Sequence, residues 1–274
     1  MLYASSSEME RIGLIAGNGN FPLLFAKAAR RRGDKIVAVA IKEETSKRLV
    51  KYVDTIHWIG VGELNKLFQI FRKGKINRAI MAGQIRPSFL FNNISMDREF
   101  KILLESVKDK KADSLLGAVA KRLGEMGITL INSTTYLLDF LPSEGVLTSR
   151  SPTSKEWQDI QFGKKVAKQI AGIDIGQTVV VKDKAVLAIE AMEGTDETIL
   201  RGGKLGNGYA VVVKVSKPRQ DMRFDIPVVG PRTIDSLVTS RAKVLAIEAK
   251  KTLLIDKGRC IKKANSHGIA IVAI

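Results

Sequence analysis

Length, composition and charge already narrow the possible classes of protein. The chain has 274 residues, 45% of them hydrophobic, which is enough for one large hydrophobic core or two ordinary ones. It has no apolar stretch of about 18 residues, no secretory leader pattern at its start and a single cysteine, Cys260, so a membrane-spanning helix, a disulfide framework and a zinc quartet are excluded. We expect a cytoplasmic protein whose residues 1–8 form a disordered extension.

The formal net charge of +17 at pH 7 favours an anionic partner, which could be nucleic acid, a membrane face or a polyanionic substrate. The basic residues lie in scattered clusters, for example within 30–32, 108–111 and 262–263, at the ends or solvent faces of predicted helices. Solvated surfaces explain such clusters most simply. Because no zinc finger, aromatic RNA-binding motif or basic heptad accompanies the charge, a nucleic-acid partner is disfavoured.

Residues 9–135 predict a Rossmann-like domain in which strands and helices alternate, as in a parallel sheet with crossover helices. The predicted strands are 12–16, 36–41, 55–59, 78–82 and 128–131, and the predicted helices are 21–32, 63–72, 97–107 and 113–126. The loops after parallel strands share one edge of the sheet.

Two of these loops are candidates for nucleotide binding. They contain Gly17, Asn18 and Gly19 after the first strand, and Gln84 after the strand 78–82. Backbone N–H groups at such a strand-to-helix junction can receive phosphate, although a simple tight turn explains the glycines too. The dinucleotide fingerprint requires a third glycine where Pro22 stands, and no ribose-binding acid ends the second strand, so an NAD site is disfavoured.

Regular alternation stops at residues 136–152, where prolines, glycine and serines indicate an inter-domain linker. Residues 153–274 then predict a second α/β domain with a mixed sheet and a ligand cleft between the two domains. It begins with a helix over 154–171 and has strands at 178–181, 186–191, 209–215, 244–248, 252–255 and 269–272, with a hairpin turn at 182–184. The hexapeptide VLAIEA occurs twice, at 186–191 and 244–249, and two buried strands of similar composition explain it better than a repeat.

Two segments of the second domain carry the residue types that bind a phosphate and a divalent cation. Polar residues crowd the end of the strand 186–191, and residues 214–227 mix cations, carboxylates and two prolines. Magnesium prefers one or two carboxylates together with phosphate oxygens, and lysine or arginine can offset the remaining phosphate charge. A solvated loop with internal ion pairs is the alternative explanation. Neither His57 nor His267 lies in a catalytic context.

At these residues the chain resembles the LpxI family of UDP-2,3-diacylglucosamine pyrophosphatases, which act in lipid A precursor synthesis. The segments that carry the resemblance are GLIAGNGNFP (13–22), MAGQIRP (81–87), GVLT (145–148), DIGQTVVV (174–181), EAMEGTD (190–196) and VKVSKPRQDMRFDIPVVGP (213–231). The chain departs from the family pattern at Gln84, where a basic residue is common, and at Glu197 and Thr198.

The resemblance implies hydrolysis of UDP-2,3-diacylglucosamine to UMP and 2,3-diacylglucosamine 1-phosphate (lipid X), with Mg²⁺ and with water attacking the uridine-side phosphorus. The expected catalytic residues are Asp225, Asp196 and Asp221; the expected metal ligands are Asp225, Asp196 and Glu190; and the expected substrate-binding residues are Gly17, Asn18, Gly19, Gln84, Gln177, Thr195, Lys214 and Lys217. In this hypothesis Asp225 orients magnesium or activates water, and the two lysines neutralise diphosphate charge.

A substrate with two acyl chains also implies a peripheral protein at the inner face of the inner membrane, attracted there by its basic surplus. No feature of the sequence sets an oligomeric state. The rival functions are a nucleotide-sugar-binding oxidoreductase, a non-enzymatic nucleotide-binding protein and a nucleic-acid binder. The first lacks the dinucleotide fingerprint, and the last would need strongly salt-dependent binding to DNA.

Overall fold

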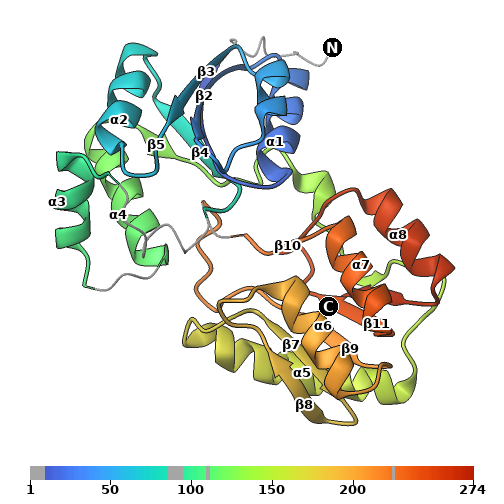
Figure 1. Cartoon of the computed structure of the whole chain (residues 1–274). Helices are drawn as coiled ribbons and strands as arrows, with labels where there is room; N and C mark the ends of the chain where they lie inside the picture. The colour runs from blue at the N-terminus through green and yellow to red at the C-terminus, as the bar shows by residue number, and fades with distance from the viewer. Residues whose placement is uncertain (1–9, 86–94, 109–111, 224–225) are drawn as a thin grey trace, which may run out of the picture. The chain divides into compact units, whose positions relative to one another are not determined.

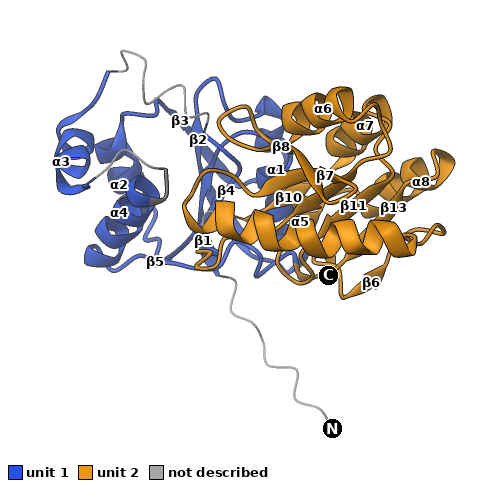
Figure 2. Cartoon of the chain, turned by 90° about the horizontal axis from the view of Figure 1, so that it is seen from below, with its two compact units in different colours: residues 1–137, 222–225 blue, residues 138–221, 226–274 orange. Residues whose placement is uncertain are grey.

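The chain folds into two compact α/β units. A computed structural model describes residues 10–85, 95–108, 112–223 and 226–274. Unit 1 comprises the chain up to residue 137 and a short return at 222–225, and unit 2 comprises 138–221 and 226–274 (Figures 1 and 2). The predicted fold class, a parallel-sheet domain followed by a mixed-sheet domain, is confirmed. The predicted extension 1–8 and Asp225 lie outside the described residues.

Unit 1 is built on a five-stranded parallel sheet of order β3-β2-β1-β4-β5. Its elements are β1 (Arg11–Ala16), α1 (Phe21–Arg31), β2 (Lys35–Ile41), the 3₁₀ helix η1 (Lys47–Tyr52), β3 (Thr55–Ile59), α2 (Leu64–Lys73), β4 (Arg78–Ala82), α3 (Arg98–Ser106), α4 (Ala112–Glu125) and β5 (Thr129–Leu130). The order reverses between β1 and β4, so the loops after these two strands are neighbours at the carboxyl edge of the sheet.

Helices cover both faces of this sheet, which explains why its central strands are apolar along their length. Figure 1 shows α1 on one face and α2, α3 and α4 on the other. The second face is a hydrophobic core that includes Val39, Phe71 and Leu123, all fully buried. Gly13 in β1 allows the closest approach, because a Cβ there would lie 2.7 Å from the ring of Phe71.

Unit 2 contains a six-stranded mixed sheet of order β6-β13-β11-β9-β7-β8, in which β9, β11 and β13 are parallel and the remaining pairs are antiparallel. Its elements are η3 (Leu138–Phe140), β6 (Gly145–Val146), α5 (Ser154–Gly172), β7 (Thr178–Lys182), β8 (Ala185–Ile189), α6 (Thr195–Leu205), β9 (Val211–Lys214), β10 (Val228–Val229), α7 (Pro231–Thr239), β11 (Val244–Ile247), β12 (Leu253–Leu254), α8 (Lys257–Ser266) and β13 (Ala270–Ala273). Strands β10 and β12 form a separate parallel pair.

The sheet of unit 2 is the middle of three layers. Helix α5 packs on one face, where Ile160 and Ala167 join the core of β7, β9, β11 and β13. Gly163 brings this helix close to the sheet, because a Cβ there would lie 2.7 Å from Val213. Helices α6, α7 and α8 contribute to the second core on the opposite face (Figure 2). A capping box of Thr153 and Glu156 fixes the start of α5.

Two features of unit 2 differ from the sequence-based expectations. Residues 138–152, expected as a linker, belong to unit 2, where β6 pairs with the edge of β13. Helices α6 and α7 were not predicted, because both are short and begin at a glycine cap without a side-chain signal. A helix was expected at the basic cluster 262–263, without bounds, and α8 is that helix. The hairpin turn is confirmed: Asp183 and Lys184 both have positive φ, as a type I′ turn requires.

Among the described residues, no helix is both long enough and apolar enough to cross a membrane.

Candidate phosphate-binding site

The two loops predicted at the carboxyl edge of unit 1 lie against each other. The amide of Asn18 donates a hydrogen bond of 2.6 Å to the carbonyl of Gln84, and the amide of Gly17 donates one of 2.8 Å to the carbonyl of Ala82. Glycine is required for this approach, because a Cβ on Gly17 would lie 2.5 Å from the Gln84 oxygen and one on Gly83 would lie 2.4 Å from the Asn18 oxygen.

We call these hydrogen bonds between the two loops the bridge. The bridge limits the role that the glycine-rich loop can play. The amides of Gly17 and Asn18 already have acceptors inside the protein, and the Asn18 side chain donates a hydrogen bond of 2.9 Å to Glu44. Gly19 differs, because its φ is +89° and a Cβ there would meet open space. The predicted residues of unit 1 are therefore brought together, and Gly19 is the position where a ligand could approach the backbone most closely.

The return segment of unit 1 is attached beside the same edge. After β5 the amide of Ser133 donates to the carbonyl of Met222 at 3.0 Å. The Ser133 hydroxyl lies within hydrogen-bonding reach of the carbonyls of Met81, at 2.8 Å, and Arg223. Ser133 is fully buried and was not predicted as a site residue. It anchors the end of the segment that begins at Lys214 in unit 2.

In unit 2 the polar side chains gather at the carboxyl ends of the parallel strands. Strand β8 runs in the same direction as β9 and β11, because both β8 and β9 are antiparallel to β7. The residues that follow β8 and β11 therefore share this edge with the end of β9 and the start of β7. We call the following set the polar edge of unit 2: Asp174, Gln177, Thr178, Glu190, Thr195, Lys214, Ser216, Lys217 and Glu248.

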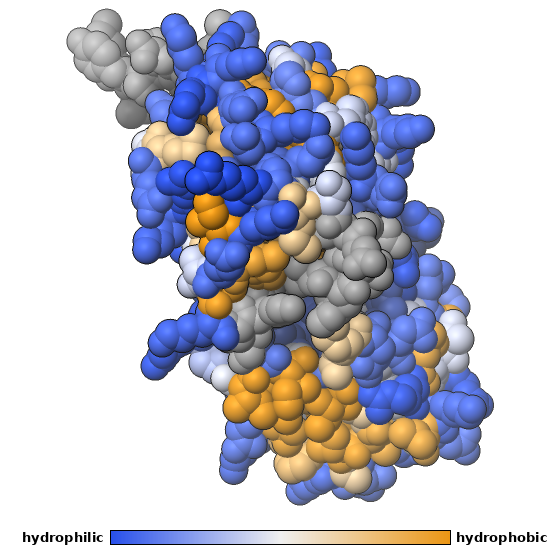
Figure 3. All heavy atoms as spheres, turned by 60° about the vertical axis from the view of Figure 1, so that its left-hand side comes forward, coloured by the Kyte–Doolittle hydropathy of each residue, from blue (hydrophilic) through white to orange (hydrophobic). Residues whose placement is uncertain are grey.

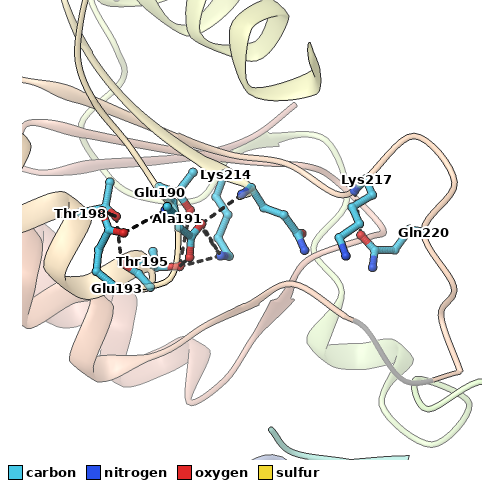
Figure 4. Close-up of polar contacts among 11 residues, drawn as sticks. Glu190, Ala191, Glu193, Thr195, Thr198, Lys214, Lys217 and Gln220 are labelled. Carbon is cyan, nitrogen blue, oxygen red and sulfur yellow. Dashed lines mark hydrogen bonds and ion pairs between the residues drawn. The ribbon is translucent and has the colours of Figure 1, made fainter. Parts of the chain in front are cut away.

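Lys214 is the central cation of the polar edge (Figure 4). Its side chain is 7% exposed, and its ammonium lies 2.7 Å from the Thr195 hydroxyl, 3.4 Å from the Thr178 hydroxyl and 3.8 Å from a carboxylate oxygen of Glu190. The Thr195 hydroxyl donates in turn to Glu190 at 2.7 Å. Since Thr195 is the first residue of α6, this network fixes the start of that helix to β7, β8 and β9.

Glu190 is ionised within this network. Burial of the carboxyl disfavours its charged form and would raise its pKa, but the Lys214 ammonium and the hydrogen bonds from Thr178, Thr195 and the Gln177 backbone outweigh burial and lower the pKa. The Gln177 amide lies 3.2 Å from Glu190, and the Gln177 carbonyl accepts from Val215. The predicted residues Gln177, Glu190, Thr195 and Lys214 are therefore in one cluster.

The second predicted lysine of this edge is also paired within unit 2. Lys217 forms an ion pair of 2.6 Å with Asp174, and its amide donates to the side chain of Gln220 at 2.7 Å. Both lysines expected to neutralise phosphate thus have a carboxylate partner, which offsets part of their charge before a ligand binds. Figure 4 shows Lys217 and Gln220 on the chain that leaves the end of β9.

A second ionised glutamate, Glu248, was missed by the sequence analysis. One of its oxygens accepts from Lys168 at 2.6 Å and from both the amide and the hydroxyl of Ser216, and the other accepts from Lys251 at 2.8 Å. Burial opposes ionisation of this carboxyl, but these donors prevail and lower its pKa to about 2. The signal was the repeated hexapeptide VLAIEA, whose fifth residue is Glu190 in one copy and Glu248 in the other.

The amino ends of α6 and α7 complete the polar edge. Both helices begin after a glycine, Gly194 or Gly230, which provides no side-chain cap. Asp196 and Arg232, the second residues of the two helices, lie 3.7 Å apart. The first N–H groups of a helix and its dipole attract anions, so the start of α6 beside Lys214 is the best-formed phosphate-binding position among the described residues of unit 2.

Of the three predicted magnesium ligands, the described residues include Glu190 and Asp196, so the set as a whole stays a prediction. The described residues contain no group of three His, Cys, Asp or Glu side chains arranged for a metal. Each oxygen of Glu190 already accepts a hydrogen bond from a protein donor and the side chain is only 12% exposed, which leaves less room for a metal. Asp196 fits better, since it is partly exposed beside the start of α6. Asp221 ends the unit 2 part of the segment, and Asp225 lies outside the described residues.

Comparison with known proteins gives two matching family models that together cover most of the chain. The LpxI N-terminal domain matches residues 11–140 and the LpxI C-terminal domain matches residues 143–272. A curated relative, the UDP-2,3-diacylglucosamine pyrophosphatase LpxI of Caulobacter vibrioides, is 28% identical over 278 aligned residues, which cover 97% of this chain and 98% of the relative.

Other similarities are partial. The bifunctional purine biosynthesis protein PurH of Bradyrhizobium diazoefficiens is 29% identical over 140 residues, which cover 46% of this chain and 24% of that protein. A solved ADP complex of N5-carboxyaminoimidazole ribonucleotide synthetase aligns with a TM-score of 0.29 and 14% identity, over 63% of this chain and 32% of that one. A similarity this low supports no functional argument.

Proposed function

We propose a function for this chain from one premise: it belongs to the LpxI family, whose two domain models match its two halves. We propose that it hydrolyses the diphosphate of UDP-2,3-diacylglucosamine to UMP and 2,3-diacylglucosamine 1-phosphate in lipid A synthesis. The name of the full-length relative from Caulobacter vibrioides supports this substrate. The two acyl chains of the substrate would make this a peripheral protein at the cytoplasmic face of the inner membrane.

The observation that carries the proposal is the buried Lys214 ammonium beside the glycine-capped start of α6. A phosphate at this position would accept hydrogen bonds from the first amides of the helix. Lys214 adds positive charge, and its bond to Thr195 holds the helix start in place. Such preorganised donors stabilise a diphosphate without having to move when charge shifts during hydrolysis.

Magnesium dependence is part of the proposal. When bound, Mg²⁺ would neutralise diphosphate charge and lower the pKa of a coordinated water. Asp196 at the start of α6 and the acidic residues of the segment 221–225 would hold it together with phosphate oxygens. Glu190 is better placed as the partner that fixes Lys214 than as a metal ligand, because its oxygens are already used. Asp225, chosen from the sequence motif, is the proposed group that orients the attacking water.

The test is product analysis by mass spectrometry after incubation of the full-length protein with UDP-2,3-diacylglucosamine, either with Mg²⁺ or with EDTA. We expect UMP and lipid X with Mg²⁺ alone. Asp225→Asn should lower kcat by roughly a hundredfold or more, because it removes a charged group at the reacting centre. The control is Asp235→Asn, which removes an exposed carboxylate of α7 that pairs with Lys263 and should leave kcat unchanged.

Hydrolysis in ¹⁸O-labelled water identifies the phosphorus that is attacked. Label in UMP supports the expected attack on the uridine side, whereas label in the sugar phosphate would replace that step and leave the proposed products intact. A folded wild-type protein that binds the substrate but releases neither product with Mg²⁺ would disprove the proposal. The chain would then be a non-enzymatic nucleotide-binding protein.

A further inference from the structure

Three large apolar side chains beside the polar edge are exposed to solvent. Ile173 and Ile175 lie in the turn between α5 and β7 and are 63% and 47% exposed, and Met192 follows β8 and is 73% exposed. We call these three residues the apolar rim. Burying such side chains is normally favourable, so a surface that leaves several of them open beside a binding site requires an explanation.

The apolar rim is continuous with the polar edge. The turn that carries Ile173 and Ile175 also carries Asp174, which pairs with Lys217. The same turn lies against the segment of Met192, because Gly176 approaches Glu190 so closely that a Cβ on Gly176 would lie 2.0 Å from the Glu190 oxygen. The apolar side chains are therefore fixed at the border of the cluster that contains Lys214, rather than on an unrelated surface.

Charged residues of both signs border the apolar rim, because Asp174 lies between the two isoleucines and Glu193 follows Met192. Pro218 lies close to the turn, since a Cβ on Gly172 would be 3.7 Å from its ring, and the next residue, Arg219, is exposed. Figure 3 shows an extended apolar area on unit 2 in the lower half of the view, with hydrophilic residues on several of its sides. Exposed apolar side chains with charged and polar neighbours can lie in the interface of a lipid bilayer, and the net charge of +17 adds attraction to anionic lipid.

We propose that the apolar rim inserts into the acyl boundary of a lipid bilayer and so presents the polar edge to substrate that resides in the membrane. This inference rests on the proposed function, which requires a diacylated substrate to reach the site. A lipid surface fits better than a folded protein partner, because a stable protein interface needs roughly 20 to 30 residues a side. Shallow insertion of a few side chains, assisted by surface charge, is sufficient for reversible membrane binding.

The test is sedimentation of the full-length protein with phosphatidylcholine vesicles at about 1 M salt, where charge attraction is screened beyond about 3 Å. The variant combines Ile173→Ser, Ile175→Ser and Met192→Ser. Its control combines Val186→Ser, Leu205→Ser and Tyr209→Ser, three side chains of unit 2 that are also exposed but lie outside the apolar rim. Both variants change exposed positions, and their melting temperatures verify that they fold.

We expect the wild-type protein and the control to bind the vesicles, and the rim variant to bind roughly tenfold or more weakly, since three buried apolar side chains are lost. The inference is overturned if the wild type does not bind, if both variants bind equally, or if only the self-association of the protein changes. Hydrolysis of detergent-solubilised substrate separates the two proposals: the rim variant should retain kcat, whereas failure of the wild type to hydrolyse it would count against the proposed function alone.

Discussion

The carboxyl edges of the two sheets both contain candidate site residues, but the two edges are built from different chemical groups. In unit 1 the edge is made of backbone: the loops after β1 and β4 touch through Gly17 and Gly83, and their amides and carbonyls bond to each other. In unit 2 the edge is made of paired charges that are buried or partly buried: Lys214 with Glu190, and Lys168 with Glu248. Backbone contact needs glycine, whereas buried charge needs a partner for every ion.

This contrast shows where tolerance to substitution should be low and why. Unit 1 should be sensitive to the addition of any Cβ at the bridge and insensitive to changes of surface charge. Unit 2 should be sensitive to the removal of one charge of a pair, because the remaining charge stays buried without compensation. The following predictions test this difference, and they run from the largest expected effect to the smallest.

Glu190→Gln should produce the largest loss of stability. The substitution leaves the Lys214 ammonium, 7% exposed, without its carboxylate. We expect the free energy of unfolding to fall by about 3 to 5 kcal/mol, as for other broken buried pairs. Chemical denaturation measures it, with Glu63→Gln as control, because Glu63 pairs with the exposed Lys66 and should contribute under about 1 kcal/mol. If both variants lose the same free energy of unfolding, the buried pair contributes no more to stability than an exposed one.

Gly83→Ala and Gly19→Ala separate strain from steric contact in unit 1. Both glycines have φ of +89°, so alanine is strained at either position. Only Gly83 also faces a backbone oxygen, 2.4 Å from the added Cβ. We expect Gly83→Ala to lower the free energy of unfolding by roughly 2 kcal/mol more than Gly19→Ala. If thermal and urea denaturation give the same value for both, the loops of the bridge can move apart freely.

The pH dependence of stability should reveal Glu248. The native-state pKa of this carboxyl is about 2, below its ordinary value of 4.5, so its ionised form stabilises the fold above about pH 4.5 and this stabilisation is lost as the pH falls towards 2. The free energy of unfolding of the wild type should exceed that of Glu248→Gln by about 2 kcal/mol near neutral pH. This difference should disappear as the pH is lowered towards 2. Urea denaturation at several pH values measures this difference, and a difference that stays constant with pH would contradict the lowered pKa of Glu248.

The smallest predicted effect concerns the start of α5, the helix that carries Lys168. The Thr153 hydroxyl accepts from the Glu156 amide, and the Glu156 carboxylate accepts from the Thr153 amide. Thr153→Ala removes half of this capping box and should lower the free energy of unfolding by about 1 kcal/mol. Thr153→Ser keeps a hydroxyl and serves as the matched control. If Thr153→Ala lowered the free energy of unfolding more than Glu190→Gln does, the cap of α5 would matter more for stability than the buried ion pair, contrary to our expectation.

Most of the fold of unit 1 was predictable from the sequence, and the reasons are physical. Apolar runs such as 36–41 are long, buried on both faces and separated by helical periodicity, so strands and helices were placed within one or two residues. Unit 2 was harder. Its helices α6 and α7 begin at Gly194 and Gly230, which carry no capping side chain, and no element was predicted for their short amphipathic patterns.

The candidate site was predictable in part. Glu190, Thr195 and Lys214 stood out as polar residues at strand ends, and the structure brings them together. Glu248 and Ser133 could not be assigned, because their roles depend on partners far away in the sequence: Lys168 and Ser216 for the first, Met222 for the second. Pairing of this kind follows from the order of strands in the sheet, which a sequence pattern does not specify.

The most direct test of the central claim, that the polar edge of unit 2 holds the diphosphate, is the dissociation constant of UDP with Mg²⁺, measured by calorimetry for two lysine variants. Lys214→Met removes the ammonium beside the start of α6. Lys182→Met removes one that bonds to Gly206 at 2.7 Å, at the opposite end of β7. We expect Lys214→Met to weaken UDP binding by roughly 30-fold, about 2 kcal/mol, and Lys182→Met to leave it within about twofold. Equal affinities for both folded variants would contradict a diphosphate site at the polar edge.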